Sequence, residues 1–307
     1  MDGDGDVDTV GASYFAGRIS WWENDGNETF TKHLIAEGLE HVGPVHAADM
    51  DGDGDADVLG AASYGGEINW WENEGSETFT KHTIADNRDA GGSVVAGDLD
   101  GDGDLDILGV SNADHISWWE NDGSGTFTEH PITDNFEGAT FVCAADVDGD
   151  GDVDVLGTAL IAGLISWWEN DGSETFVEHP VTDSFGGANS VGAADLDSDG
   201  DMDVLAAALL AGEISWWEND GSETFTERPI ADGFGAANSV CPADVDGDGD
   251  VDILGTGSGA GEIAWWENDG SGSFAKHTIA DGLEGPGSVC ASDVDGDALY
   301  YWLQYSR

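Results

Sequence analysis

The stretch SVVAGDLDGDGDLDILGVSNADHISWWENDGSGTFTEHPI, residues 93–132, contains four short strand-like segments separated by turn residues. SVVAGD and LDILGVS flank an aspartate–glycine loop, and HISWWE and FTEHPI flank NDGSG, in which Asp-Gly is a strong hairpin signal. None of the four segments shows the 3.6-residue apolar period of a helix. The stretch therefore predicts four antiparallel β-strands.

The same pattern recurs along the whole chain of 307 residues. The motif WWEN begins at Trp21, Trp70, Trp118, Trp167, Trp216 and Trp265, in steps of 48 or 49 residues. Four short strands in a repeat of this length are typical of a β-propeller blade. We expect an all-β fold, a single propeller of six four-stranded blades over residues 1–297, with seven blades as the alternative. Residues 298–307, ALYYWLQYSR, form a divergent aromatic tail.

The tryptophan pairs and the chain ends support a ring of blades. Neighbouring strand residues point to opposite faces of a sheet, so both indoles are buried only if the blade is covered on both faces. The chain begins inside an acidic loop and ends with the strand-like segment GSVCASD, residues 287–293. We expect this C-terminal strand to join the N-terminal blade and close the ring, which removes the exposed sheet edges.

The acidic loop DMDGDGDAD, residues 49–57, carries aspartate at positions one, three, five, seven and nine. Two carboxylates about 4 Å apart repel by roughly 4 kcal/mol at an effective dielectric near 20, so such a loop stays extended in water or wraps around a cation. The pattern recurs from Asp98, Asp146 and Asp244, and from Asp195 with Ser198 in place of the first glycine. Oxygen donors alone favour Ca²⁺ over Mg²⁺, zinc or copper. Solvated acidic turns are the alternative.

The loop differs from an EF-hand at its end. An EF-hand loop carries glutamate at position twelve. The residues at that position here are Gly60, Gly109, Gly157, Ala206 and Gly255. The loop instead closes with aspartate at position nine, immediately before a strand, which predicts a strand-loop-strand site.

These repeats resemble the FG-GAP/VCBS family, whose propeller blades carry calcium loops similar to those of integrin α-chain propellers. SFGGAN at 184–189 and GFGAAN at 233–238 loosely match the Phe-Gly and Gly-Ala elements of that family. The resemblance implies calcium ligands from the side chains at positions one, three, five and nine and from the carbonyl at position seven. The resulting sets are Asp49, Asp51, Asp53, Asp55 and Asp57; Asp98, Asp100, Asp102, Asp104 and Asp106; Asp146, Asp148, Asp150, Asp152 and Asp154; Asp195, Asp197, Asp199, Asp201 and Asp203; and Asp244, Asp246, Asp248, Asp250 and Asp252.

About five calcium ions are therefore expected, and the ends of the chain offer a composite sixth site. Asp293, Asp295 and Asp297 supply positions one, three and five, after which Tyr301 stands where an aspartate belongs. Asp8, from the N-terminus, would close this site if the two ends meet.

Charge excludes some functions. The net charge is −58, with 65 acidic and 7 basic residues, so nucleic acid and anionic membranes are poor partners. No apolar run is long enough for a membrane span, and the N-terminal MDGDGDVD is not expected to be a signal peptide, because it lacks a basic segment and an apolar stretch. Weak calcium loops are typical of proteins outside cells. We expect an extracellular or cell-surface monomer.

No nucleophile motif, phosphate loop or zinc signature is present, so no residue is predicted to be catalytic. The fourth-strand histidines recur in the blades, which favours a structural role: His33, His82, His130, His179 and His277, with Arg228 in the remaining blade. The WWEN glutamates are expected to bind backbone near the hairpin: Glu23, Glu72, Glu120, Glu169, Glu218 and Glu267. The expected function is non-enzymatic binding or adhesion to a protein or glycan. An enzyme acting on sugars or polysaccharides and a passive scaffold within a larger secreted protein are the alternatives.

Overall fold

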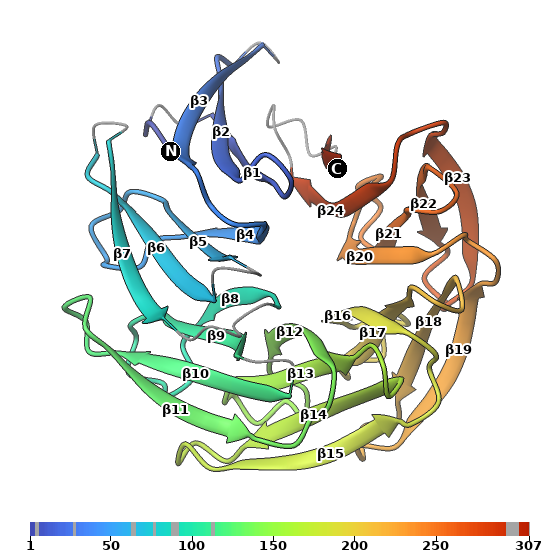
Figure 1. Ribbon diagram of the computed structural model, residues 1–307. Helices are drawn as coiled ribbons and strands as arrows, with labels where there is room; N and C mark the ends of the chain where they lie inside the picture. Colours follow the sequence, from blue (N-terminus) through green and yellow to red (C-terminus); the bar gives the residue numbers. More distant parts are fainter. Residues whose placement is uncertain are drawn as a thin grey trace. The chain divides into compact units, whose positions relative to one another are not determined.

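The computed structural model describes residues 1–3, 6–26, 29–62, 66–75, 78–86, 92–111, 114–292 and 301–306. These residues form antiparallel β-strands and turns, with no α-helix among them (Figure 1). The fold class is confirmed: the chain is an all-β propeller with six blades, each containing one WWEN strand.

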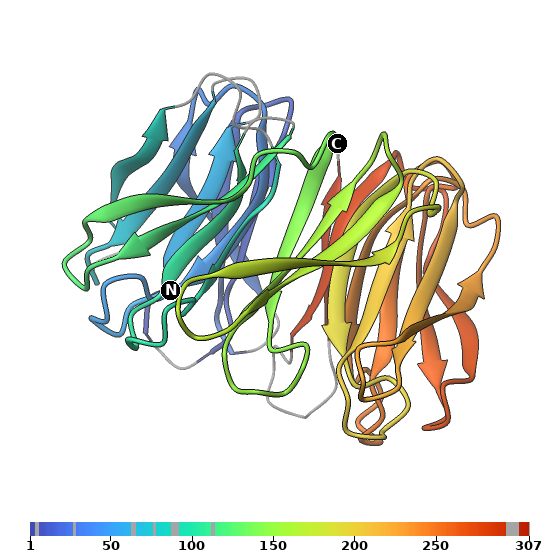
Figure 2. The same cartoon turned by 90° about the horizontal axis from the view of Figure 1, so that it is seen from below.

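Strands lie in sequence order within each blade, and Figure 2 shows them as twisted antiparallel ribbons. The N-terminal blade has three strands: β1 (Thr9–Ser13), β2 (Arg18–Asn24) and β3 (Phe30–Glu37). The second blade has β4 (Val42–Ala48), β5 (Asp57–Ala62), β6 (Glu67–Asn73) and β7 (Phe79–Asp86). The third has β8 (Val94–Gly97), β9 (Asp106–Ser111), β10 (His115–Asn121) and β11 (Phe127–Thr133).

The remaining blades follow the same order. The fourth has β12 (Ala139–Ala145), β13 (Asp154–Ala159), β14 (Leu164–Asn170) and β15 (Phe176–Thr182). The fifth has β16 (Ala188–Ala194), β17 (Asp203–Ala208), β18 (Glu213–Asn219) and β19 (Phe225–Ala231). The sixth has β20 (Ala237–Ala243), β21 (Asp252–Gly257), β22 (Glu262–Asn268) and β23 (Phe274–Ala280).

The C-terminal segment pairs differently from the expectation. β24 (Pro286–Ser292) forms a two-stranded sheet with β25 (Tyr301–Ser306), and the N-terminal blade has three strands rather than four. Tyr301 pairs with Ser292, just as Asp252 pairs with Ala243 in the sixth blade. Part of the aromatic tail thus supplies a second strand next to β24. Ring closure stays a prediction, because it concerns how the two compact units of the chain meet.

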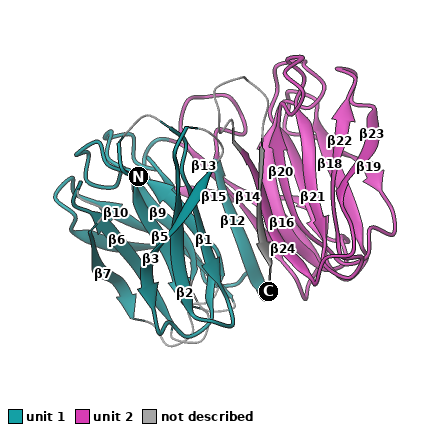
Figure 3. Cartoon of the chain, turned by 90° about the horizontal axis from the view of Figure 1, so that it is seen from above, with its two compact units in different colours: residues 1–144, 172–174 teal, residues 145–171, 175–307 magenta. Residues whose placement is uncertain are grey.

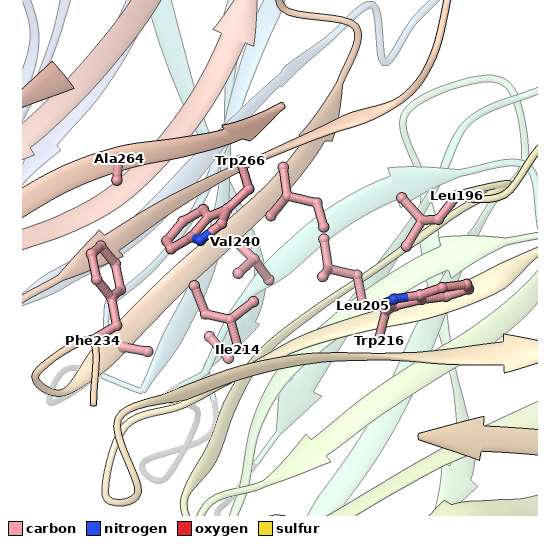
Figure 4. Packing of buried hydrophobic residues seen from close by; sticks show 11 residues of the cluster. Leu196, Leu205, Ile214, Trp216, Phe234, Val240, Ala264 and Trp266 are labelled. Carbon is pink, nitrogen blue, oxygen red and sulfur yellow. The ribbon is translucent and has the colours of Figure 1, made fainter. Parts of the chain in front are cut away.

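The chain divides into two compact units, residues 1–144 with 172–174 and residues 145–171 with 175–307 (Figure 3). Each unit has cores between neighbouring blades. In the second unit, Trp216 of β18 and Trp266 of β22 belong to one buried cluster with Ile214 and Phe234 (Figure 4). The first indole of one blade and the second indole of the next therefore share one core, as the opposite directions of neighbouring strand residues require.

The same arrangement occurs in the first unit, where Trp70 and Trp119 share a cluster with Met50 and Ile68. Ten of the twelve WWEN tryptophans are buried, and Trp22 and Trp265 are half-buried. The expectation that both indoles of each pair are buried holds for the four blades from β4 to β19. Trp22 and Trp265 belong to the first and sixth blades.

Candidate metal centres

The five acidic loops connect the first strand of a blade to its second. They span residues 49–57, 98–106, 146–154, 195–203 and 244–252. In each loop, position nine is also the first residue of the second strand. The end of each loop is therefore fixed by the sheet, whereas its middle lies at the surface.

Position nine is the anchor of each loop. The Asp57 carboxylate is buried and accepts hydrogen bonds on both oxygens, Oδ2 from the Met50 amide at 3.0 Å and Oδ1 from the Asn73 amide at 2.7 Å. Both bonds recur in all five loops, with Oδ2 distances of 2.8–3.0 Å and Oδ1 distances of 2.7–2.9 Å. Each carboxylate oxygen has two lone pairs, so a metal can still bind.

Burial makes the charge at position nine costly. Desolvation raises the pKa of Asp57, Asp106 and Asp252 to about 6, and that of Asp154 and Asp203 to about 7, although backbone hydrogen bonds act in the opposite direction. A buried carboxylate of this kind gains from a neighbouring cation, because an opposite charge favours the ionised form.

Position one folds the loop around itself. Asp98 Oδ1 accepts a hydrogen bond from the Gly101 amide at 2.8 Å, and its Oδ2 accepts one from the Gly103 amide at 3.1 Å. Gly103 has φ +99°, a conformation that L side chains rarely adopt, so glycine is required there. Ser198, which replaces the first glycine in its loop, has φ +63° and keeps the same turn.

The side chains at positions three and five continue this turn. Asp100 Oδ1 accepts from the Asp102 amide at 3.0 Å, and Asp102 Oδ1 accepts from the Asp104 amide at 2.9 Å. Three carboxylates come within 4.8 Å of one another in at least four of the described loops. These groups are Asp49, Asp51 and Asp53; Asp98, Asp100 and Asp106; Asp146, Asp148 and Asp154; and Asp195, Asp197 and Asp199. Desolvation, followed by repulsion from neighbouring carboxylates, raises the pKa of Asp51 at position three.

The side chain at position seven lies elsewhere. Asp55 Oδ2 would be 2.5 Å from a Cβ added to Gly75, which lies in the turn after the WWEN strand. The same proximity joins Asp104 to Gly123 and Asp250 to Gly270. These carboxylates therefore lie against a neighbouring turn, which leaves the backbone carbonyl as the position-seven group that could face a metal.

Among the described loop residues, two carboxylate oxygens are buried without a hydrogen-bond partner. They are Asp49 Oδ1 and Asp197 Oδ1. An unpaired buried carboxylate oxygen costs several kcal/mol unless another group compensates it. Clustered carboxylates, oxygen donors alone and these two orphaned atoms together fit a hard divalent cation such as Ca²⁺.

The composite sixth site is only partly described. Asp8 occupies the position-nine place of the N-terminal blade, where its Oδ1 accepts from the Asn24 amide at 2.9 Å and its Oδ2 contacts the Met1 ammonium at 2.7 Å. Asp293, Asp295 and Asp297 lie outside the described residues. The composite site therefore stays a prediction.

The asparagine of WWEN links neighbouring blades. Asn121 donates from Nδ2 to the carbonyl oxygen of Met50, which follows the first aspartate in the loop of the preceding blade, at 2.9 Å. Asn268 makes the equivalent bond to Leu196 at 2.8 Å. Both asparagines are buried. Sequence reasoning gave this residue no role, because its partner lies about one and a half repeats away.

The glutamate of WWEN binds a histidine, and the expectation that it binds backbone near the hairpin was wrong. Glu72 Oε2 lies 2.6 Å from His82 Nε2. His82 is paired directly with Trp70 across β6 and β7 and stacks on that indole, with ring centroids 4.6 Å apart. Glu72 is therefore diagonal to His82 on the same sheet face, which is within reach of long side chains. Four further blades repeat the Glu–His pair at 2.7–2.8 Å, and Arg228 takes the place of histidine beside Glu218.

Comparison with known families identifies the repeat. The FG-GAP-like repeat family matches residues 1–60, 49–109, 108–157, 162–206, 207–255 and 244–299, which together span nearly the whole chain. The chain belongs to the FG-GAP-like repeat family. The resemblance expected from the aspartate loops is therefore confirmed. No curated protein matches this FG-GAP-like chain in a sequence comparison.

Solved structures share the fold of this FG-GAP-like chain. Virginiamycin B lyase from Staphylococcus aureus aligns with a TM-score of 0.66 at 15% identity, covering 94% of this chain and 86% of that one. A catalytically inactive variant of the lyase with quinupristin aligns with a TM-score of 0.64 at 15% identity, covering 96% and 90%. A nidogen–laminin complex aligns with a TM-score of 0.51 at 12% identity, covering 77% and 81%. These similarities concern the fold alone.

Within the described part of the chain, no helix has the length and apolar character that crossing a bilayer requires.

Proposed function

We propose that this chain is a calcium-binding propeller that serves outside the cell or at its surface as a binding module for a protein or glycan. In each loop, the side chains at positions one, three, five and nine and the carbonyl at position seven would hold one Ca²⁺. The buried, unpaired Asp49 Oδ1 and Asp197 Oδ1 are the observation that supports this assignment most strongly.

Calcium in the loops would be structural. Five ions would supply ten positive charges against twenty side-chain carboxylates. Each loop joins two strands through its position-nine aspartate, so neutralising the loop would stabilise the sheet directly. Because the loops have many exposed residues, we expect the modest affinity of extracellular modules, with Kd about 10⁻⁴ to 10⁻³ M.

The opposite ends of the strands offer the binding surface. In the second unit, backbone hydrogen bonds connect successive turns there: Phe185 donates to Gly163 at 3.0 Å, and Leu209 donates to Gly187 at 2.7 Å. Two of these turns carry exposed aliphatic side chains, Ile161 at 79% and Leu210 at 73%. Exposed apolar side chains on neighbouring turns are typical of an interaction surface.

A glycan array probed in 5 mM Ca²⁺ and in EDTA tests this function. The double variant Ile161→Ser, Leu210→Ser removes the aliphatic turns, and Val177→Ser is the matched control, because Val177 is 50% exposed on an outer strand, β15. We expect retention of a glycan by the calcium-loaded wild type and by the control, and loss of retention in the double variant.

The outcomes distinguish the alternatives. Retention that persists in EDTA or in the double variant contradicts the proposed surface and its dependence on calcium. Release of shortened products from the array would assign the chain to enzymes instead. An array without any bound glycan would restrict the proposal to protein ligands.

A further inference from the structure

A group of mixed metal-ligating side chains lies beside the acidic loop of residues 146–154 but includes none of its residues. Glu169 of β14, His179 of β15 and Glu223, from the turn after β18, each offer one donor atom, and these atoms lie within 4.8 Å of one another. The three residues come from two successive blades of the second unit. None belongs to an acidic loop, although Glu169 is electrostatically coupled to Asp148 of the 146–154 loop, so the group consists of residues other than the calcium ligands proposed above.

The histidine of this group is held in a fixed position. Its ring stacks on Trp167, with centroids 4.7 Å apart and an interplanar angle of 22°. Trp167 is buried, so the stacking surface is rigid. His179 Nε2 lies 2.8 Å from Glu169 Oε2, and both side chains are about one-third exposed. An imidazole and a carboxylate are thus preorganised side by side, with access to solvent.

The third residue occupies a backbone position that normally favours glycine. Glu223 has φ +60°, and its counterparts in two other blades are Gly125 at φ +74° and Gly272 at φ +71°. A Cβ added to Gly125 would lie 3.1 Å from Trp70, and one added to Gly272 would lie 2.9 Å from Trp216. This turn position therefore lies against the first tryptophan of the preceding blade, and a side chain there reaches that blade's histidine.

The donor set has a clear metal preference. One imidazole nitrogen and two carboxylate oxygens suit zinc and related transition metals, whereas Ca²⁺ and Mg²⁺ favour oxygen ligands alone. A non-glycine residue in the left-handed region is less favourable than glycine, because its Cβ crowds the backbone. Placing a charged glutamate there beside a second carboxylate adds repulsion that a divalent cation would relieve.

We propose that Glu169, His179 and Glu223 form a second class of metal site, which binds Zn²⁺-type divalent cations in preference to Ca²⁺. Solvent would complete the coordination, as in zinc sites with three protein ligands.

Other blades provide internal contrasts. The Glu72–His82 pair has the same geometry, at 2.6 Å, but faces Gly125. The blade with Arg228 in place of histidine faces Gly272. Neither blade has the third ligand, so neither is predicted to bind the metal. One further set repeats all three residue types: Glu120, His130 and Glu174, with a His–Glu distance of 2.8 Å and φ +60° at Glu174. This set would form a second, independent site of the same kind.

Calorimetric titration with Zn²⁺ in saturating Ca²⁺ tests the proposal. Glu223→Gly introduces the residue that the same turn carries at Gly125 and Gly272, so the fold should tolerate it. We expect Glu223→Gly and His179→Gln each to weaken one zinc site more than about tenfold, since even residues that only support metal ligands contribute 10- to 100-fold. His82→Gln is the matched control and should bind zinc as the wild type does. Glu174→Gly should affect a different site.

Each contrary outcome overturns the proposal. If Glu223→Gly binds as much zinc as the wild type with unchanged affinity, Glu223 is not a ligand. If His82→Gln loses as much binding as His179→Gln, any Glu–His pair suffices and no three-residue site exists. If the wild type binds no zinc in Ca²⁺, His179 merely pairs with two carboxylates. Two controls separate these outcomes from misfolding. Thermal unfolding of each variant is measured in Ca²⁺, and Glu223→Gln removes the charge while keeping the side-chain length.

Discussion

The side-chain amide of Asn121 donates a 2.9 Å hydrogen bond to the carbonyl oxygen of Met50, and so joins one blade to the acidic loop of the blade before it. The Met50 amide, in turn, donates to Asp57 in its own loop. One buried asparagine therefore lies two hydrogen bonds from the position-nine carboxylate of a neighbouring blade. This connection would let blade packing and the proposed metal binding stabilise each other.

Replacing Asn121 with alanine should lower both stability and metal affinity. The change leaves the buried Met50 carbonyl without this donor, which costs about 1–3 kcal/mol of unfolding free energy. Urea unfolding in Ca²⁺ measures that loss, and calcium titration should show weaker binding at the loop of residues 49–57. Ser124→Ala is the control, because Ser124 Oγ bonds within its own turn, to Asp122 at 2.6 Å and to Thr126 at 3.2 Å. Equal effects of the two variants would contradict the link.

Chelation of calcium should lower the melting temperature markedly. At 5 mM Ca²⁺ and a Kd of about 10⁻⁴ to 10⁻³ M, each filled loop contributes about 1–2 kcal/mol by mass action. Melting curves followed by circular dichroism in Ca²⁺, in EDTA and after calcium is restored measure the effect. Magnesium at the same concentration is the control and should recover little of the loss. Coincident curves in Ca²⁺ and EDTA would refute a structural role.

The repeat predicts much of this fold because its signals are local. The Asp-Gly turn and the alternating strands lie within about 40 residues, so the positions of successive WWEN motifs predict where each blade and each acidic loop lies. Aspartate at position nine, next to an aliphatic pair, predicts a loop that ends at a buried strand. The structure agrees, since Asp57 is the first residue of the buried strand β5.

The contacts that sequence reasoning missed depend on register and packing. Glu72 meets His82 because a register shift at Ile68 and Asn69 aligns Trp70 with His82. A one-residue slip would reverse every side chain on that strand, and the sequence does not specify the bulge. The constant ten-residue spacing of glutamate and a basic residue was the available signal. The Asn121–Met50 bond spans 71 residues and exists only after two blades pack together.

The pH dependence of stability should reverse when calcium is removed. In the metal-free fold, the pKa of Asp154 and Asp203 is about 7, above the ordinary 3.8. The folded state then binds protons more tightly than the unfolded state, so these groups stabilise the fold at low pH. That stability is lost as the pH rises through about 7. With calcium, ionised ligands are required, so binding and stability should increase over the same range.

Urea unfolding at pH 5, 6, 7 and 8, in EDTA and in Ca²⁺, measures both trends. We expect the unfolding free energy to fall with pH in EDTA and to rise with pH in Ca²⁺. Parallel curves in the two buffers would mean that the position-nine aspartates are not the groups on which calcium and protons compete.

Replacing the aspartate at position three should have opposite effects on the protein in Ca²⁺ and in EDTA. Asp51→Asn removes a charged ligand but keeps an oxygen that can accept from the Asp53 amide, a bond of 3.2 Å in the structure. Calcium affinity at this loop should fall more than about tenfold, by analogy with other lost metal-site groups. In EDTA the same variant should be slightly more stable than the wild type, by up to about 1 kcal/mol, because the charge repulsion at this partly exposed site is relieved.

Asp55→Asn provides the matched comparison at position seven. Its side chain lies toward Gly75, and the family resemblance implies that only its carbonyl binds calcium. Calorimetric calcium titration of both variants should therefore show one weakened site in Asp51→Asn and five intact sites in Asp55→Asn. If Asp55→Asn also weakens a site, its carboxylate is a ligand and the implied division between side-chain and backbone donors is wrong. If neither variant changes calcium binding, the loop of residues 49–57 does not hold the ion.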